Sequence, residues 1–202
     1  MKKIIYITVS LLFLLTQQSF AVVKIDITRG NLEPLPIAVS NFYLDNPEKF
    51  SAELKKLKLD EKISGVIKNN LKRSGLFNII DPKSYIQSPK IAHLKPRFED
   101  WALIKSQVMV SGKLLIDNKK RLRVEFRLWD VVAAKEIEGL ALFATPESWR
   151  RIAHIISDKI YERLTGESGY FDTRIIYVAE TGSKEQRVKK LAIMDQDGAN
   201  NK

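Results

Sequence analysis

A change of hydrophobic period near residue 170 is the feature that most constrains how this chain can fold. Apolar residues from Trp149 to Leu164 recur with the spacing of an amphipathic helix, and Gly166 is placed as its left-handed C-terminal residue. From Thr173 to Ala179, and again from Val188 to Met194, the pattern is that of β-strands rich in branched and aromatic residues. A lone pair of strands is only marginally stable in water. The sequence therefore predicts a complete unit up to about residue 171, followed by the beginning of a repeated β-structure.

The first 21 residues have the parts of a cleavable export signal. Lys2 and Lys3 precede an apolar run of 12 residues from Ile4 to Leu15, and Ser19-Phe20-Ala21 places small residues at a cleavage site. A membrane-spanning helix needs about 20 apolar residues, so the run is too short for a transmembrane anchor. We expect export with cleavage after Ala21, the alternative being a signal that is retained. The chain has no cysteine, which excludes a lipoprotein, disulfides and thiolate metal sites.

The segment that follows the signal alternates apolar and polar residues. In Val22–Gly30, the apolar residues Val23, Ile25 and Ile27 alternate with polar ones, which is typical of a short amphipathic strand. Such a strand is either an edge of its own domain, which the residues alone favour, or a mobile arm that adds to a partner's sheet.

Between residues 34 and 171 the pattern predicts the order β-α-β-β-β-β-α. This order indicates an α/β fold with a mixed β-sheet and two main helices packed on it. Leu32–Pro36 is expected to be an extended linker because of its two prolines. The expected strands are 37–42, 77–80, 107–116, 122–130 and 137–144, the main helices are 60–74 and 147–164, a further helix runs from 46 towards 58, residues 84–95 form a loop, and 101–105 form one helical turn.

A search for catalytic, metal-binding or cofactor-binding motifs predicts no such site. His154 and Asp158 have the spacing to share a hydrogen bond on the last helix, but no nucleophile motif accompanies them, and a surface or packed histidine is favoured over a catalytic one. His93 has no partner that the sequence identifies. The Asp195–Gly198 run shares D-x-D-G with calcium loops but lacks the glutamate that completes one. A turn with Gly198 at positive φ is favoured instead.

Charge leaves three classes of partner open. The net charge is +10 at pH 7, and the basic residues are scattered rather than gathered in one tract. A basic surface is compatible with nucleic acid, an anionic membrane or an acidic protein, and a solvated basic face is the simplest reading. Trp101, Trp129 and Trp149 lie in patterned segments and are expected in the core rather than on a base-stacking platform.

Several segments together resemble the TolB family of the Tol-Pal system. These are LTGESGYFDTRIIYVAE at 164–180, LAIMDQDGAN at 191–200, SGLFNIID at 74–81, PIAV at 36–39 and the exported N-terminus with its short strand. The chain departs from the family pattern in an apparent expansion at 46–59 and in stopping after half a propeller blade. The resemblance implies a periplasmic protein with a signal peptide at 1–21, an N-terminal arm at 22–33, an α/β domain at 34–171, and the start of a truncated β-propeller at 172–202.

The resemblance also implies partners and a function. In the family the arm binds TolA and the propeller receives Pal, and this non-enzymatic adaptor supports outer-membrane invagination and integrity during cell division. Truncation is expected to impair it, and its membrane association is expected to be peripheral. The alternatives are a fragment of an exported hydrolase that contains a propeller and, less favoured, a basic nucleic-acid-binding domain. The residues implied to bind TolA are Val22, Val23, Lys24, Ile25, Asp26, Ile27, Thr28, Arg29 and Gly30.

Overall fold

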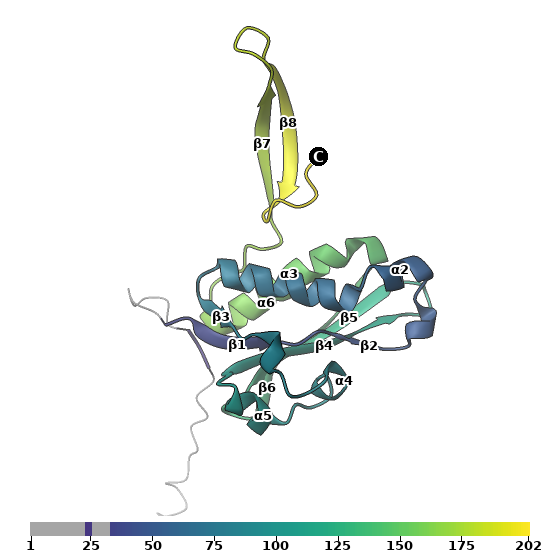
Figure 1. Cartoon of the computed structure of the whole chain (residues 1–202), viewed down its shortest axis with the longest axis vertical. Helices are drawn as coiled ribbons and strands as arrows, with labels where there is room; N and C mark the ends of the chain where they lie inside the picture. The colour runs from purple at the N-terminus through teal and green to yellow at the C-terminus, as the bar shows by residue number, and fades with distance from the viewer. Residues whose placement is uncertain (1–22, 26–32) are drawn as a thin grey trace, which may run out of the picture.

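The computed structural model describes residues 23–25 and 33–202, and its main body is a mixed β-sheet with helices on both faces (Figure 1). The sheet order is β3-β1-β4-β5-β6, with β2 also pairing with β4. Strand β1 runs parallel to β3 and β4, whereas β4, β5 and β6 form an antiparallel meander. The strands are β1 (Leu35–Val39), β2 (Tyr43–Leu44), β3 (Phe77–Ile79), β4 (Val108–Ile116), β5 (Leu122–Asp130) and β6 (Lys135–Ala144). The mixed sheet expected from the sequence is confirmed.

Two long helices, α3 (Leu59–Arg73) and α6 (Trp149–Thr165), cover one face of this sheet. The short helices α4 (Pro89–Ala92) and α5 (Phe98–Leu103) lie against the other face (Figure 1). Each long helix is followed by a glycine with positive φ, Gly75 at 76° and Gly166 at 83°. Glycine adopts this conformation without steric cost, so both helices end where the sequence predicts.

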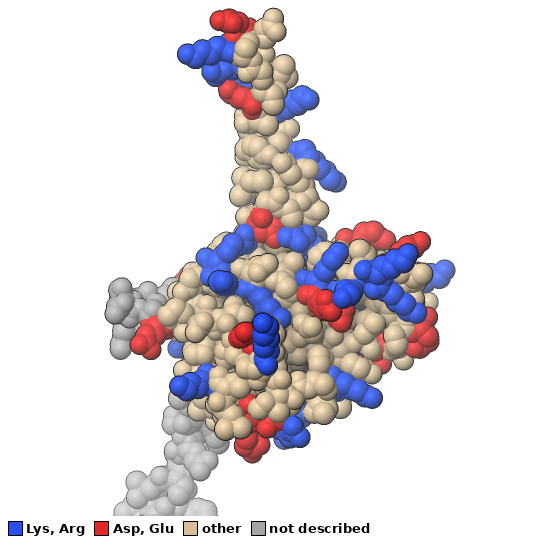
Figure 2. All heavy atoms as spheres, in the orientation of Figure 1, with Lys and Arg blue, Asp and Glu red and all other residues tan. Residues whose placement is uncertain are grey.

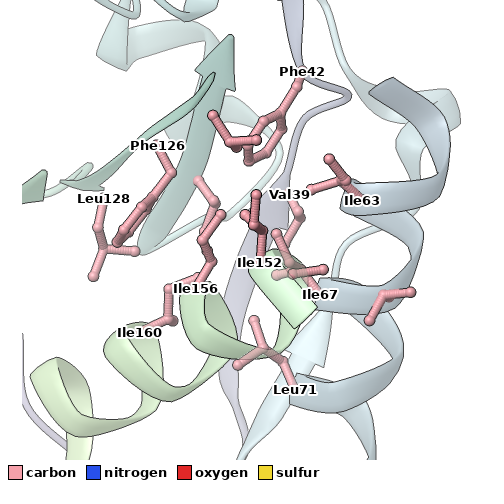
Figure 3. Close-up of a cluster of buried hydrophobic side chains, with 14 of the residues drawn as sticks. Val39, Phe42, Ile63, Ile67, Leu71, Phe126, Leu128, Ile152, Ile156 and Ile160 are labelled. Carbon is pink, nitrogen blue, oxygen red and sulfur yellow. The ribbon is translucent and has the colours of Figure 1, made fainter. Parts of the chain in front are cut away.

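The main core lies between the two long helices and the sheet (Figure 3). Ile67 from α3, Ile156 from α6 and Phe126 from β5 are each at most 1% exposed. Gly112 of β4 lies beneath the Phe42 ring, where an added Cβ would come within 2.6 Å of Phe42 Cε2 and also meet the Glu125 carbonyl. Only glycine lets the ring close over the sheet at this point.

Three expectations for the N-terminal half are wrong in detail. The segment 84–95, expected to be a loop, contains α4. The expected linker Leu32–Pro36 ends in β1, because buried Leu35 belongs to the core and Pro36 accepts a hydrogen bond from Gln107 N through its carbonyl. The helix expected from 46 towards 58 is divided into a 3₁₀ turn, Pro47–Lys49, and α2, Ala52–Lys56. Phe50 separates them in an extended conformation with its ring buried, and Ser51 then caps α2.

A two-stranded hairpin, β7 (Arg174–Thr181) and β8 (Val188–Asp195), projects from the main body (Figure 1). The turn after β8 is confirmed: Gly198 has φ 84°, and its N–H donates to the Asp195 carbonyl. Beyond the turn, Lys202 exchanges two backbone hydrogen bonds with Ile193. This small sheet is open, as an incomplete propeller blade would be. Among the described residues no helix is long and apolar enough to cross a bilayer.

Replacing Gly65 by alanine should raise the free energy of unfolding by about 0.5–1 kcal/mol, because glycine is a poor residue inside a helix. Gly65 lies within α3, and no atom lies within 4 Å of the Cβ it would gain. Urea denaturation measures the change. The control is Gly75→Ala at φ 76°, which should lower stability instead. A loss for Gly65→Ala would contradict the prediction.

Candidate functional site

The first candidate site is the point where the predicted arm meets the α/β unit, here called the arm root (Val23, Lys24 and Ile25). Ile25 N donates to the Leu164 carbonyl at the end of α6 over 2.7 Å, and Val23 N donates to Asp130 Oδ2 over 3.2 Å. Ile25 is buried in the main core, Val23 is half-buried against it, and Lys24 is exposed. The burial follows the predicted alternation, but these residues belong to no strand. Val22 and 26–30 of the predicted site lie outside the described residues.

Asp130 is the residue that joins the arm root to the sheet. It ends β5 and is fully buried, and its second carboxylate oxygen accepts a hydrogen bond from Ala133 N over 2.8 Å. One carboxylate therefore holds both the turn into β6 and the start of the arm. A groove of about 500 Å³ opens beside this point, between α6 and the edge strand β6, and includes Lys24, Glu138 and Arg163 in its lining.

The second candidate site is the junction socket, formed by Asn70 and Arg73 on α3 and by Arg150 and His154 on α6. It receives the turn after β8. Arg73 Nη2 donates to Gln196 Oε1 over 2.7 Å, and Arg150 forms an ion pair with Asp197. Charges of both signs gather at this foot of the hairpin (Figure 2). The two sheets are thus joined through charged and polar groups rather than through the apolar core.

Asn70 is the centre of the junction socket and uses both ends of its amide. Its Oδ1 accepts from Arg73 Nη2 over 3.0 Å and from Gln196 Nε2 over 3.2 Å. Its Nδ2 contacts Ser157 Oγ at 3.0 Å and His154 Nδ1 at 2.9 Å. Arginine can only donate, so the amide oxygen must face Arg73 and the amide nitrogen must face His154. His154 Nδ1 is therefore an acceptor, and the neutral ring carries its proton on Nε2.

Electrostatics in the junction socket follow from burial and from Arg150. Burial lowers the pKa of His154 from its ordinary value, and this outweighs the opposing pull of the Asp197 carboxylate. Burial also acts to raise the pKa of Asp197, but the N–H of Ala199 and the charge of Arg150 outweigh it and hold that pKa below its ordinary value. At neutral pH the socket therefore contains a neutral histidine and an ionised Asp197.

The linker between α6 and the hairpin is held by Asp158. Its carboxylate accepts from Phe171 N over 2.6 Å and from Asp172 N over 3.0 Å. Burial raises the pKa of Asp158. The hydrogen bond that the spacing of His154 and Asp158 allows is not formed, because Asp158 binds the linker and His154 binds Asn70. Of the surface and packed placements that the sequence left open for His154, the structure has the packed one, since His154 is 3% exposed.

One group of possible metal ligands occurs among the described residues. His154, Asp195 and Asp197 each offer a ligand atom within 4.8 Å of the others. However, Arg150 already pairs with Asp197, and its Nε lies 3.8 Å from Asp195. The ring nitrogen facing these carboxylates also carries a proton, so it cannot ligate an ion without disrupting Asn70. The arrangement suits the docking of one segment on another better than it suits a cation.

Sequence reasoning missed two contacts of the histidines. His93 stacks on Tyr43, with ring centroids 4.6 Å apart and planes at 14°, and it contacts the Pro89 carbonyl through Nδ1. The Asn70–His154 pair joins residues 84 positions apart on two helices. No local spacing signals either contact.

Comparison with known proteins identifies the family. A family model for the TolB amino-terminal domain matches residues 23–137, more than half of the chain. The Tol-Pal system protein TolB of Pelagibacter ubique (strain HTCC1062) is 59% identical over 187 residues, which are 92% of this chain and 42% of that protein. The crystal structure of TolB from Acinetobacter baumannii superposes with a TM-score of 0.67 at 24% identity, over 84% of this chain and 38% of that one, and supports the fold. The chain thus spans about two fifths of the length of these relatives, and the match of its α/β unit shows that it belongs to the TolB family.

Proposed function

We propose that this chain acts as a non-enzymatic adaptor of the Tol-Pal system in the periplasm, with Val22–Gly30 as the segment that binds TolA. The observation that carries the proposal is the arm root. Its two N–H groups, Ile25 N bonded to the Leu164 carbonyl and Val23 N bonded to the Asp130 side chain, tether the segment to the ends of α6 and β5. The similarity to the Pelagibacter ubique Tol-Pal protein supports the system to which we assign it.

An alternating segment at a mature N-terminus has the chemistry needed to bind a sheet edge. Its N–H and C=O groups can complete a partner's ladder, while its apolar side chains enter pockets on one side. Ile25 is already buried in this protein's own core, at 8% exposure. A partner that binds Ile25 must therefore first withdraw its side chain from this protein's core.

That competition sets an energetic threshold for capture. Withdrawing a buried isoleucine costs about 1.5–3 kcal/mol. A cost of this size weakens apparent affinity by roughly 10- to 100-fold relative to an arm that is already free. TolA binding then becomes a shift between a docked and a released arm, which events elsewhere in the protein can bias. In this proposal Pal binds the propeller that begins at residue 172, and together the contacts support outer-membrane constriction.

Deleting Val22–Gly30 should abolish capture of the TolA periplasmic domain, because the strand that completes the partner's sheet is then missing. Capture is measured by surface plasmon resonance with the exported, processed chain immobilised. Near-ultraviolet circular dichroism verifies that the α/β unit remains folded. Unchanged capture by the deleted chain would refute the assignment of the arm.

A matched variant tests the tether without removing the arm. In Asp130→Asn, one oxygen remains to accept from either Val23 or Ala133 but not from both. Loss of the hydrogen bond to Val23, worth about 1 kcal/mol, should strengthen TolA capture roughly fivefold by favouring the released arm. Weaker capture would show that the docked arm is the form that binds.

A further inference from the structure

The ring of His154 is buried, with one nitrogen bonded and the other without a partner. The side chain is 3% exposed, and Nε2 is shielded from solvent with no hydrogen-bond partner in the described chain. Nε2 lies 3.8 Å from Asp197 Oδ2, which is too far for a hydrogen bond. On the opposite side, Nδ1 accepts from Asn70. The ring therefore lies between α3 and the turn that docks the hairpin.

Protonation of this ring conflicts with the orientation of Asn70. A charged imidazole donates from both nitrogens, so Nδ1–H would face the amide N–H₂ of Asn70 at 2.9 Å. Relief requires the amide to turn over. The turned amide would present its nitrogen to Arg73 Nη2 and Gln196 Nε2, both of which now donate to its oxygen. One added proton thus breaks the hydrogen bond by which Asn70 holds Gln196, and it leaves only the bond from Arg73 to Gln196 on the α3 side.

The charged groups around His154 act in opposite directions. Asp195 and Asp197 from the turn after β8, and Asp172 from the linker, favour the protonated ring. Burial, the largest influence, and Arg150 on the same helix oppose it. Arg73 on α3 acts through Asn70. With the hairpin docked, the balance keeps the pKa of His154 below its ordinary value. Release of the hairpin exposes the ring to water and returns the pKa of His154 towards its ordinary value of about 6.5.

We propose that His154 is the proton-sensing residue of a latch that docks the β7–β8 hairpin on α3 and α6. Neutral His154 keeps the Asn70 amide in the orientation that holds Gln196. Protonated His154 turns that amide over and so weakens the docking of the hairpin. Because the pKa of His154 is lower in the docked state than in the released state, docking is strongest above about pH 6.5 and weakens as pH falls from there towards the lowered pKa. At pH 5.5 the ratio of released to docked hairpin should rise by up to about tenfold.

The absence of cysteine from the sequence makes a distance measurement direct. Spin labels are attached to Ser183→Cys in the hairpin turn and to Lys119→Cys in the exposed turn after β4, both in the full chain. Pulsed electron paramagnetic resonance then records the distribution of distances between the two spin labels at pH values from 8 to 5. We expect one narrow population at pH 7.5 and a second, broader one that grows reversibly below pH 6.5.

The two histidines provide a matched pair of variants. His154→Gln, which cannot gain a proton, should show no pH response between pH 8 and pH 5, whereas His93→Gln should respond as the parent does. A response that persists in His154→Gln, or that begins only below about pH 4.5, where carboxylates titrate, would overturn the latch.

A nitrogen-detected NMR spectrum reports the protonation of the His154 ring directly. It uses a chain that keeps His154, so it does not depend on whether the His154→Gln variant folds. In the His93→Gln chain only His154 remains, and at pH 7.5 it should show a protonated Nε2 and an unprotonated Nδ1. Its titration should share its midpoint with the opening of the hairpin. The opposite tautomer, unlinked midpoints, or a change in the ring signals on adding Zn²⁺ would overturn the proposal, the last in favour of a metal site.

Discussion

Replacing Phe126 by alanine is expected to lower the free energy of unfolding by about 3–5 kcal/mol. Phe126 lies in the middle of β5, opposite Gly112 on one side and Leu140 on the other, and is 1% exposed. Its ring belongs to the main core between the sheet and the long helices, where it lies beside Leu128 (Figure 3). Truncation removes its burial and leaves a cavity that the close-packed neighbours can fill only in part.

Phe143 is the matched control for this substitution. It belongs to β6, is 48% exposed, and lies under the guanidinium groups of Arg121 and Arg123 at 4.8 and 5.4 Å. Phe143→Ala should cost no more than about 1 kcal/mol, the size of an exposed cation–π contact. Urea denaturation of both variants measures the difference. Equal losses would show that the core is not organised around β5.

Replacing Asn70 by alanine should cost about 3 kcal/mol and loosen the hairpin. Asn70 is fully buried and bonds to His154, Ser157, Arg73 and Gln196. Removing its amide leaves buried donors and acceptors unpaired, and each such group costs about 1–3 kcal/mol. Thermal unfolding gives the stability change, and the rate of tryptic cleavage in the hairpin reports its release.

The adjacent asparagine controls for the residue type. Asn69 lies on the same helix but is exposed, so Asn69→Ala should change stability by less than about 0.5 kcal/mol and leave cleavage unchanged. If Asn70→Ala behaved like Asn69→Ala, the junction socket would have no structural role.

Much of the fold could be predicted because the signals are local. Strand β5 matches its expected bounds, Leu122–Asp130, because its alternation reflects one buried and one partly exposed face. Gly166 ends α6 as expected, because glycine tolerates the positive φ that ends a helix and can be read from the sequence at one position. The division of the segment 46–58 could not be predicted in this way. It depends on the burial of Phe50 against distant parts of the core, which overrides local helix preference.

The candidate sites were less accessible to sequence reasoning. The sequence left open whether His154 is packed or on the surface, and its spacing suggested Asp158 as a possible partner, whereas the structure buries it against Asn70. Spacing along one helix reveals only the neighbours on that helix, whereas Asn70 and Asp197 come from other elements. At the arm root, the alternation correctly indicated which of Val23, Lys24 and Ile25 are buried, but not that a helix end would accept the hydrogen bond.

The geometry of the hairpin makes it a mechanical lever with its fulcrum at the junction socket. It is held at its foot by the turn after β8, and each strand has eight residues, so the tip lies about 26 Å away at roughly 3.3 Å per residue. A tilt of about 10° at the fulcrum therefore displaces the tip by about 5 Å over that length. The length of the hairpin therefore amplifies any change of angle at its foot into a much larger movement at its tip.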